Sequence, residues 1–268
     1  MKFSLTIKKS EIKKGREQVL KNAAKKINIK GFRKGNAPET MVAEHLGEKA
    51  IIESTLDLIL PKAYADEVIK KKLKPISNPR INPKKIDPGS DWEFEIEIAQ
   101  KPKVVLGKYK ENVKKAQKAL KKPKKDEKSL EEDKKLKATF DTLLEKIEVK
   151  IPDLLVDDEV NNQLSRLLDQ IQKLGLTLEQ YLDSMKISKE KLKKNYEKTA
   201  KENLKLEFIL QEIIKDQDIK VLDKEINDLI NASGDEEVRK RLSTPEQKQS
   251  IAYSLAKRRA VDSLLKDK

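Results

Sequence analysis

The sequence predicts two domains of different class, an α+β domain at the N-terminus and an elongated all-α domain with helical arms after it. Apolar and polar residues alternate, as in half-buried strands, only within the first hundred residues, whereas the apolar patterns beyond Glu127 have helical spacing. Charged residues make up 40% of the chain against 37% hydrophobic and 4% aromatic, which indicates slender, solvent-bathed helices. The length of 268 residues is enough for two domains of ordinary size.

The first domain, residues 1–106, contains both strand and helix patterns. Alternation in FSLTI and in WEFEIEIA predicts two strands. Gly47 is expected to end a short helix, and Pro61 is expected to kink or interrupt a longer one. The expected elements are a strand over 3–7, a helical stretch containing 19–27, helices over 39–46 and 49–72, and a strand from 92 to about 100.

A lysine-rich linker, residues 107–126, is expected to follow. Residues 101–125 contain eleven lysines and a single acidic residue, Glu111, with Gly107 and Pro123 as helix breakers. Self-repulsion favours a solvated, partly helical and extended spacer, and direct contact with RNA is the alternative interpretation.

The second domain, residues 127–268, is expected to contain helices only. Pro152 separates the first two helices, and Asp157 or Asp158 offers an N-cap to the second, which Gly175 would end. Thr177 with Gln180 forms a capping-box pattern. The further helices are expected from a Ser188 cap to about 215, over 222–232 and 236–242, and from a Thr244 cap followed by Pro245 to the C-terminal residues.

Composition favours some functions and excludes others. The net charge of +14 favours a polyanionic partner, with nucleic acid or a nucleoprotein surface first among them. The lack of cysteine excludes disulfides, and no run of apolar residues approaches a signal-peptide core or a membrane span, so we expect a cytoplasmic protein with no membrane partner. With His45 as the single histidine and no phosphate-cradling glycine loop, we expect no catalytic residues, no metal and no cofactor.

One loop stands out as a candidate binding site, within IKGFRKGNAPETM at residues 29–41. Its glycines suit turn geometry, and a solvated connector is the plain interpretation. An aromatic ring beside a guanidinium and an ammonium instead suits a mixed protein and RNA surface. The candidate binding residues are Gly31, Phe32, Arg33, Lys34, Gly35 and Pro38.

These residues, INIKGFRKGNAP preceded by LKNAAKKINI, resemble the ribosome-docking signature of the bacterial trigger factor family. Residues LLEKIEVKIPDLLVDDEVNNQL and the helices after them resemble the family's substrate-binding domain. The resemblance implies an ATP-independent chaperone with two partners. The docking loop would contact protein and rRNA of the large ribosomal subunit at the tunnel exit through Phe32, Arg33 and Lys34, and residues 127–268 would bind nascent or unfolded polypeptides. Which helical residues face the client, and whether the chain forms a homodimer off the ribosome, stay open.

The resemblance departs from the family pattern at the centre of the chain. Trigger factors usually carry a prolyl-isomerase domain between the two regions, and here the lysine-rich linker occupies that place. We therefore expect a reduced form that is not an enzyme. The alternative is a basic RNA-binding or ribosome-assembly factor without client-holding activity, and a free-standing isomerase is the third interpretation.

Overall fold

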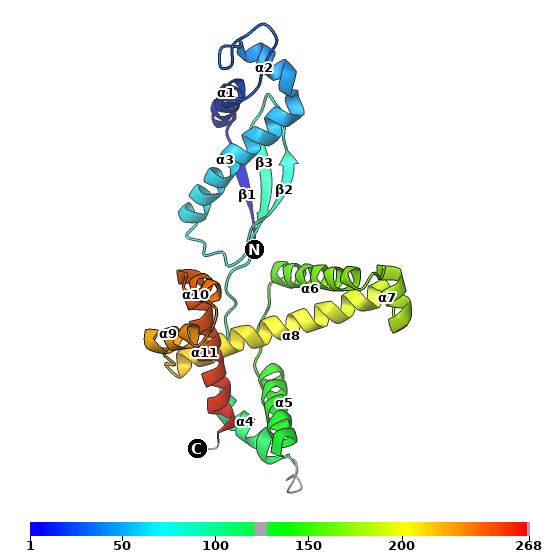
Figure 1. Cartoon of the computed structure of the whole chain (residues 1–268), viewed down its shortest axis with the longest axis vertical. Helices are drawn as coiled ribbons and strands as arrows, with labels where there is room; N and C mark the ends of the chain where they lie inside the picture. The colour runs from blue at the N-terminus through cyan, green and yellow to red at the C-terminus, as the bar shows by residue number, and fades with distance from the viewer. Residues whose placement is uncertain (121–127, 267–268) are drawn as a thin grey trace. The chain divides into compact units, whose positions relative to one another are not determined.

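The computed structural model describes residues 1–120 and 128–266, without the side chains of 128–130, and falls into two compact units, Met1–Lys101 and Pro102–Lys268 (Figure 1). The first unit is α+β and the second is built from helices, as the sequence predicts. Among the described residues, no helix is both long enough and apolar enough to cross a bilayer.

The N-terminal unit contains a three-stranded antiparallel sheet with strand order β1-β3-β2. The strands are β1 (Lys2–Ile7), β2 (Arg80–Lys85) and β3 (Trp92–Glu97). Alternate residues of β1 and β3 face one core, because Leu5 lies opposite Phe94 and Ile7 opposite Trp92. Trp92, Phe94 and Ile7 are among the largest fully buried side chains of the described chain.

Strand β2 is absent from the sequence prediction. None of the residues in its segment, RINPKK, is buried, and the segment contains Pro83. It therefore lacks the alternating signal of β3. Pairing with β3 sets its extended conformation, and the register shifts between Pro83 and Lys85. A proline is tolerated there because β2 is an edge strand.

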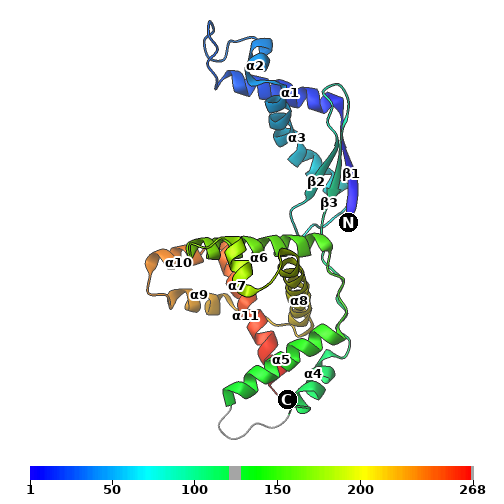
Figure 2. The same ribbon diagram turned by 90° about the vertical axis from the view of Figure 1, so that its right-hand side faces the viewer.

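Three helices complete the unit: α1 (Lys9–Ala24), α2 (Glu39–Leu46) and α3 (Glu48–Lys70). Helices α1 and α3 contribute to the core beneath the sheet, and α2 packs against these two helices. Figure 2 shows α1 leading from the end of β1 to the loop that precedes α2. The prediction for 39–46 matches α2, and Gly47 after it has a φ of 77°. The expected interruption at Pro61 is wrong, because α3 continues through this exposed proline as one helix.

The second unit begins with a helix inside the expected linker. Helix α4 (Tyr109–Lys118) places Tyr109 and Val113 in the core of the unit, against Leu143 and Ile209. The structure thus differs from the expected solvated spacer because two apolar residues, four apart, share one face of a lysine-rich helix. Residues 121–127 of that linker lie outside the described residues.

The remaining helices of the second unit form a long hairpin and a group of helices around one end of α8. The hairpin pairs α6 (Asp153–Lys173) with α8 (Lys189–Asp216), and the short α7 (Leu178–Met185) lies at its end (Figure 1). Around the base of α8 lie α5 (Lys128–Lys146), α9 (Asp223–Asn231), α10 (Glu236–Leu242) and α11 (Pro245–Leu265).

Most caps match their predictions. Thr177 and Gln180 form a reciprocal capping box at α7, Ser188 caps α8 and Thr244 caps α11. The N-cap expected at Asp157 or Asp158 is wrong, because α6 begins at Asp153. The Pro152 carbonyl accepts hydrogen bonds from the backbone of the first turn, so the proline starts the helix instead of merely stopping the one before it.

Candidate functional site

The candidate loop between α1 and α2 has a backbone that requires its glycines. Gly31 and Gly35 have φ angles of 93° and 90°, a region that side-chain-bearing residues rarely adopt. Three hydrogen bonds shape the turn: Phe32 N–H donates to the Ile29 carbonyl at 3.0 Å, Gly35 N–H to Ala24 at 2.9 Å and Asn36 N–H to Arg33 at 3.0 Å. The loop therefore folds back on the last carbonyl of α1 and has a defined shape.

The base of the loop is held by a small apolar core. Buried residues from the three helices of the unit form its centre, and Ile29 and Ala37 of the loop pack against it from both sides. These two supporting residues are absent from the sequence prediction, although two isoleucines close together, Ile27 and Ile29, are a weak indication of an apolar contact beside the loop. The buried centre of this core consists of Leu20, Ala24, Val42 and Ile51.

The tip of the loop projects its functional groups into solvent. Phe32 is 40% exposed, which is unusual for an aromatic side chain that could be buried, and Arg33 and Lys34 are exposed beside it. Neither cation forms an ion pair with a described residue. The tip thus combines an apolar ring with two uncompensated positive charges, which suits a partner surface that offers both an apolar recess and anionic groups.

Pro38 lies apart from the tip. It is the N-cap residue of α2, and its carbonyl accepts the hydrogen bond of Val42 N–H at 3.1 Å. Its fixed φ of −57° prepares the chain to enter the helix. Of the six candidate residues, the structure therefore brings Gly31 to Gly35 together at the tip and gives Pro38 a supporting position.

A second candidate region is the set of exposed apolar side chains on the helical unit. Four of them fall between positions 168 and 185, around the end of the α6 to α8 hairpin, and two more flank or lie on α9. The sequence left client-facing residues unassigned, because helical periodicity alone does not tell an exposed leucine from a buried one. These six residues are Leu168, Leu174, Leu176, Met185, Leu222 and Leu229; Val105, before α4, is also exposed.

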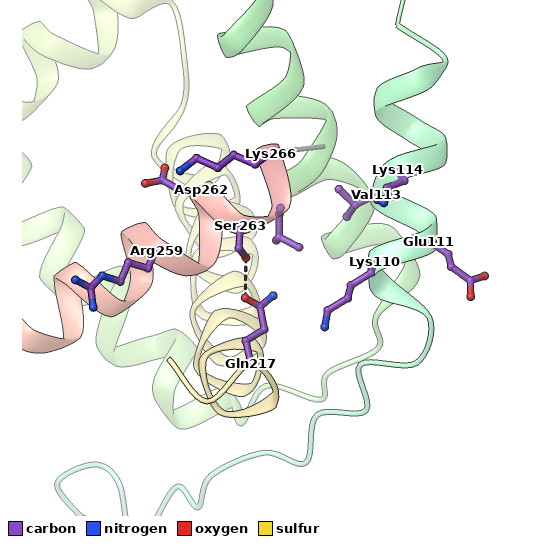
Figure 3. A pocket seen from close by; sticks show the side chains of 10 residues that line it. Lys110, Glu111, Val113, Lys114, Gln217, Arg259, Asp262, Ser263 and Lys266 are labelled. Atoms are coloured by element: carbon purple, nitrogen blue, oxygen red, sulfur yellow. Dashed lines mark hydrogen bonds between the residues drawn. The ribbon is translucent and has the colours of Figure 1, made fainter. Parts of the chain in front are cut away.

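The helical unit also contains a hollow of about 810 Å³ between α4, the end of α8 and α11 (Figure 3). Lys110 and Arg259 line it, yet both are engaged within the chain: Lys110 lies 3.4 Å from Asp216, and Arg259 pairs with Glu225 and donates to the Lys220 carbonyl at 2.6 Å. The charges of these two cations are therefore compensated within the chain. Within the part of the chain that the structure describes, no three His, Cys, Asp or Glu side chains group as metal ligands would.

Fold and site together define a class: a two-domain protein that presents a basic, aromatic-tipped loop on an α+β domain and scattered apolar side chains on a helical one. The model of bacterial trigger factor protein matches residues 1–133, and that of the bacterial trigger factor protein C-terminus matches residues 107–266. The chain belongs to the trigger factor family. The two matches overlap, so the isomerase domain that usually lies between these regions is missing from this chain.

Individual relatives match about two fifths of the chain. Trigger factor of Streptococcus agalactiae serotype Ia is 38% identical over 109 residues, which cover 41% of this chain and 26% of that protein. Trigger factor of Lactobacillus gasseri is 35% identical over 108 residues, 40% of this chain and 24% of the relative. Trigger factor of Streptococcus mutans serotype c is 36% identical over 107 residues, 40% of this chain and 25% of the relative. The matched part thus spans about a quarter of the length of these curated relatives.

A solved structure shares the fold over nearly the whole chain. It is described as "Promiscuous Substrate Recognition in Folding and Assembly Activities of the Trigger Factor Chaperone" and superposes with a TM-score of 0.67. The match covers 98% of this chain and 96% of the other, at 15% sequence identity. The fold class predicted from the sequence is thereby confirmed.

Proposed function

We propose that this chain is an ATP-independent chaperone that docks on the large ribosomal subunit beside the tunnel exit and holds nascent or unfolded polypeptides. The observation that carries the proposal is the loop tip. An exposed Phe32 sits beside two unpaired cations on a turn fixed by two positive-φ glycines. Membership of the trigger factor family supports the same role. Phe32 would enter an apolar recess of a ribosomal protein, while Arg33 and Lys34 would lie near rRNA phosphates.

For the client-binding part, we propose that the exposed apolar side chains of the helical unit make the contacts. They are spread over a hairpin end and a short helix and are surrounded by charged residues. Scattered contacts of this kind favour weak and sequence-tolerant binding, so a client can leave in order to fold. The similar solved structure is of a chaperone whose substrate recognition is described as promiscuous, which agrees with such a surface.

The docking proposal is tested by co-sedimentation of the full-length chain with ribosomes. The variant Phe32→Ala, Arg33→Ala, Lys34→Ala should lose most binding. A matched control removes one exposed apolar side chain and two exposed cations elsewhere in the same unit, by Ile69→Ala, Lys62→Ala and Lys74→Ala. The control should bind like the unchanged protein. If both variants bind equally and binding only follows salt concentration, the chain is better described as a basic RNA-binding or ribosome-assembly factor.

The client proposal is tested by suppression of aggregation of an unfolded protein without ATP. The full-length variant Leu174→Ser, Leu176→Ser, Met185→Ser should suppress aggregation less than the unchanged chain, because it loses exposed apolar surface at the hairpin end.

A control with the similarly exposed Leu58, Ile69 and Ile76 changed to serine places the same chemistry on the N-terminal unit. Equal loss in the two variants would contradict client binding by the helical unit.

A prolyl-isomerisation assay on a short peptide should show no turnover, and clear catalysis would overturn the prediction that the chain is not an enzyme.

A further inference from the structure

Positive charge is concentrated in one segment of the N-terminal unit. Residues 8–34 contain eleven lysines and arginines and only two acidic residues, a net charge of +9. The rest of that unit, residues 35–101, contains ten basic and twelve acidic residues, a net charge of −2. The segment 8–34 is α1 with the docking loop after it, so the basic excess belongs to a defined surface and not to the whole unit.

Three of these lysines form a line along the outer side of α1 and its C-cap residue, Lys25. Lys14, Lys21 and Lys25 are spaced seven and four residues apart, which places them within about 40° of one another around a helix of 3.6 residues per turn. All three are exposed, whereas Ile12 and Leu20 on the other side of the helix are buried. At 1.5 Å per residue the line extends for about 16 Å toward the loop that carries Phe32. We call these three lysines the α1 basic face.

The α1 basic face has no charge compensation from the described residues. None of its lysines forms an ion pair with a described residue. The nearby acids Glu11 and Glu17 do not pair with them either. Some exposed lysines elsewhere in the same unit do have partners: Lys49 with Glu53, Lys70 with Glu67 and Lys84 with Glu95.

Lys21 lies in the last turn of α1 and Lys25 is its C-cap, where positive charge complements the helix dipole. The two like charges lie one turn apart, so this end of the helix concentrates positive charge.

The residues between the lysines indicate which polyanion fits. Gln18 and Asn22 lie beside this line and hydrogen-bond to each other at 2.9 Å, so the outer side of α1 is polar. A helix that lies on a membrane needs an exposed apolar side, and the apolar side of α1 is buried in the core. Aromatic residues for base stacking are missing from α1. A row of cations and amides without aromatics suits the regularly spaced phosphates of a nucleic-acid backbone.

We propose that the α1 basic face binds the phosphate backbone of RNA, next to the contact made by the docking loop. The proposal rests on the proposed function for the source of the RNA, the ribosome, but RNA binding itself can be measured without ribosomes. Because backbone contacts read no sequence, this surface supplies attraction and orientation, and Phe32 supplies the local anchor.

The test measures binding of the full-length chain to a 20-base-pair RNA duplex by fluorescence anisotropy between 50 and 200 mM salt. The variant Lys14→Gln, Lys21→Gln, Lys25→Gln removes the α1 basic face. The control Lys49→Gln, Lys70→Gln, Lys84→Gln removes three exposed positive charges from other surfaces of the same unit.

Loss of three phosphate contacts should make the slope of log affinity against log salt shallower by about two to three. The unchanged chain then loses about 16- to 64-fold more affinity than the variant over this salt range. The control should keep the original slope, and equal slopes for the two variants would overturn the proposal.

Two further measurements distinguish failure of this proposal from failure of the docking proposal. Phe32→Ala should leave duplex binding unchanged while weakening ribosome co-sedimentation. If the loop variants bind ribosomes normally but the α1 basic face variant loses the duplex, docking by the loop fails and the RNA surface stands. Vesicles containing phosphatidylserine serve as the membrane probe: binding as tight as to the duplex, with the same loss in the α1 basic face variant, would overturn the assignment to RNA.

Discussion

Gly15 lies where α1 crosses α3, and its replacement by alanine provides a test of how closely these helices pack. An alanine in a helix interior is ordinarily favoured over glycine by about 0.8 to 1 kcal/mol. Here its Cβ would lie 2.6 Å from Ile59 Cγ2 and 3.2 Å from Thr55 Cγ2. Carbon atoms in good contact are about 3.5 to 4.0 Å apart, so the first distance is more than about 0.9 Å too short.

The clash is difficult to relieve. Ile59 Cγ2 is bonded directly to Cβ, and the χ1 angle of a β-branched residue in a helix is nearly fixed. Relief therefore requires a shift of the helices or a strained rotamer, which costs about 1 to 3 kcal/mol in a packed interior. After the gain in helix propensity is subtracted, we expect Gly15→Ala to destabilise the N-terminal unit by about 1 kcal/mol, within a range of about 0 to 2.

Urea unfolding of the full-length chain, followed by tryptophan fluorescence, measures this effect. Trp92 is the single tryptophan and is 1% exposed in the core of the N-terminal unit, so its signal reports on that unit. In an Ile59→Ala background the clashing methyl is gone, and the same Gly15→Ala change should then stabilise the unit by about 0.8 to 1 kcal/mol. An Ile52→Ala background weakens the same core but leaves Ile59 in place, so Gly15→Ala should still destabilise there. Stabilisation in the unchanged background, or effects that simply add, would refute the close-packing argument.

Three other predictions concern the remaining parts of the molecule. Pro61→Ala should stabilise the N-terminal unit by about 1 to 3 kcal/mol, because it restores a backbone donor at an exposed position inside α3; unchanged urea midpoints with Trp92 as probe would contradict this. Burial would raise the pKa of the Glu207 carboxyl, but hydrogen bonds from Lys257 and Tyr253 outweigh it and hold the pKa below 4.5. A carboxyl whose pKa is lower in the folded than in the unfolded state contributes stability above its unfolded pKa, and this contribution is lost as the pH falls through its folded pKa. Glu207→Gln should therefore lower thermal stability at pH 7, and the difference from the unchanged chain should shrink below pH 4.5. Gly35→Ala should weaken ribosome binding about 5- to 30-fold without unfolding the chain, because a side-chain-bearing residue at a φ of 90° costs about 1 to 2 kcal/mol. Co-sedimentation with ribosomes measures the binding, and circular dichroism is the control for folding.

Elements with local signals were predicted well from the sequence. The bounds 39–46 and 236–242 match α2 and α10. The caps at Thr177, Ser188 and Thr244 match as well, because a capping side chain bonds to a backbone only two or three residues away. The exposed Phe32 was anticipated for a related reason: two glycines in five residues indicate a turn, and a turn at a surface cannot bury a large ring.

Elements that depend on distant partners were not predicted. Strand β2 exists because β3 pairs with it, and nothing in RINPKK alone requires an extended chain. Helix α4 was hidden by lysines, although Tyr109 and Val113 carried the apolar signal, four residues apart, that buries it. The α1 basic face was visible in the sequence only as scattered lysines, and it became a surface once the structure placed Lys14, Lys21 and Lys25 on the side away from the core.

The bond from Gly35 N–H to the Ala24 carbonyl bears on the affinity that the loop would have in the proposed docking contact. Ordering one residue of a free chain costs about 1 to 2 kcal/mol of backbone entropy, which corresponds to roughly 5- to 30-fold in affinity. In this loop the bond at Gly35 and the packing of Ile29 and Ala37 fix both ends before any partner arrives. Most of that entropy is therefore lost during folding, so the docking contact that we propose for the three side chains of the tip would not require a large interface.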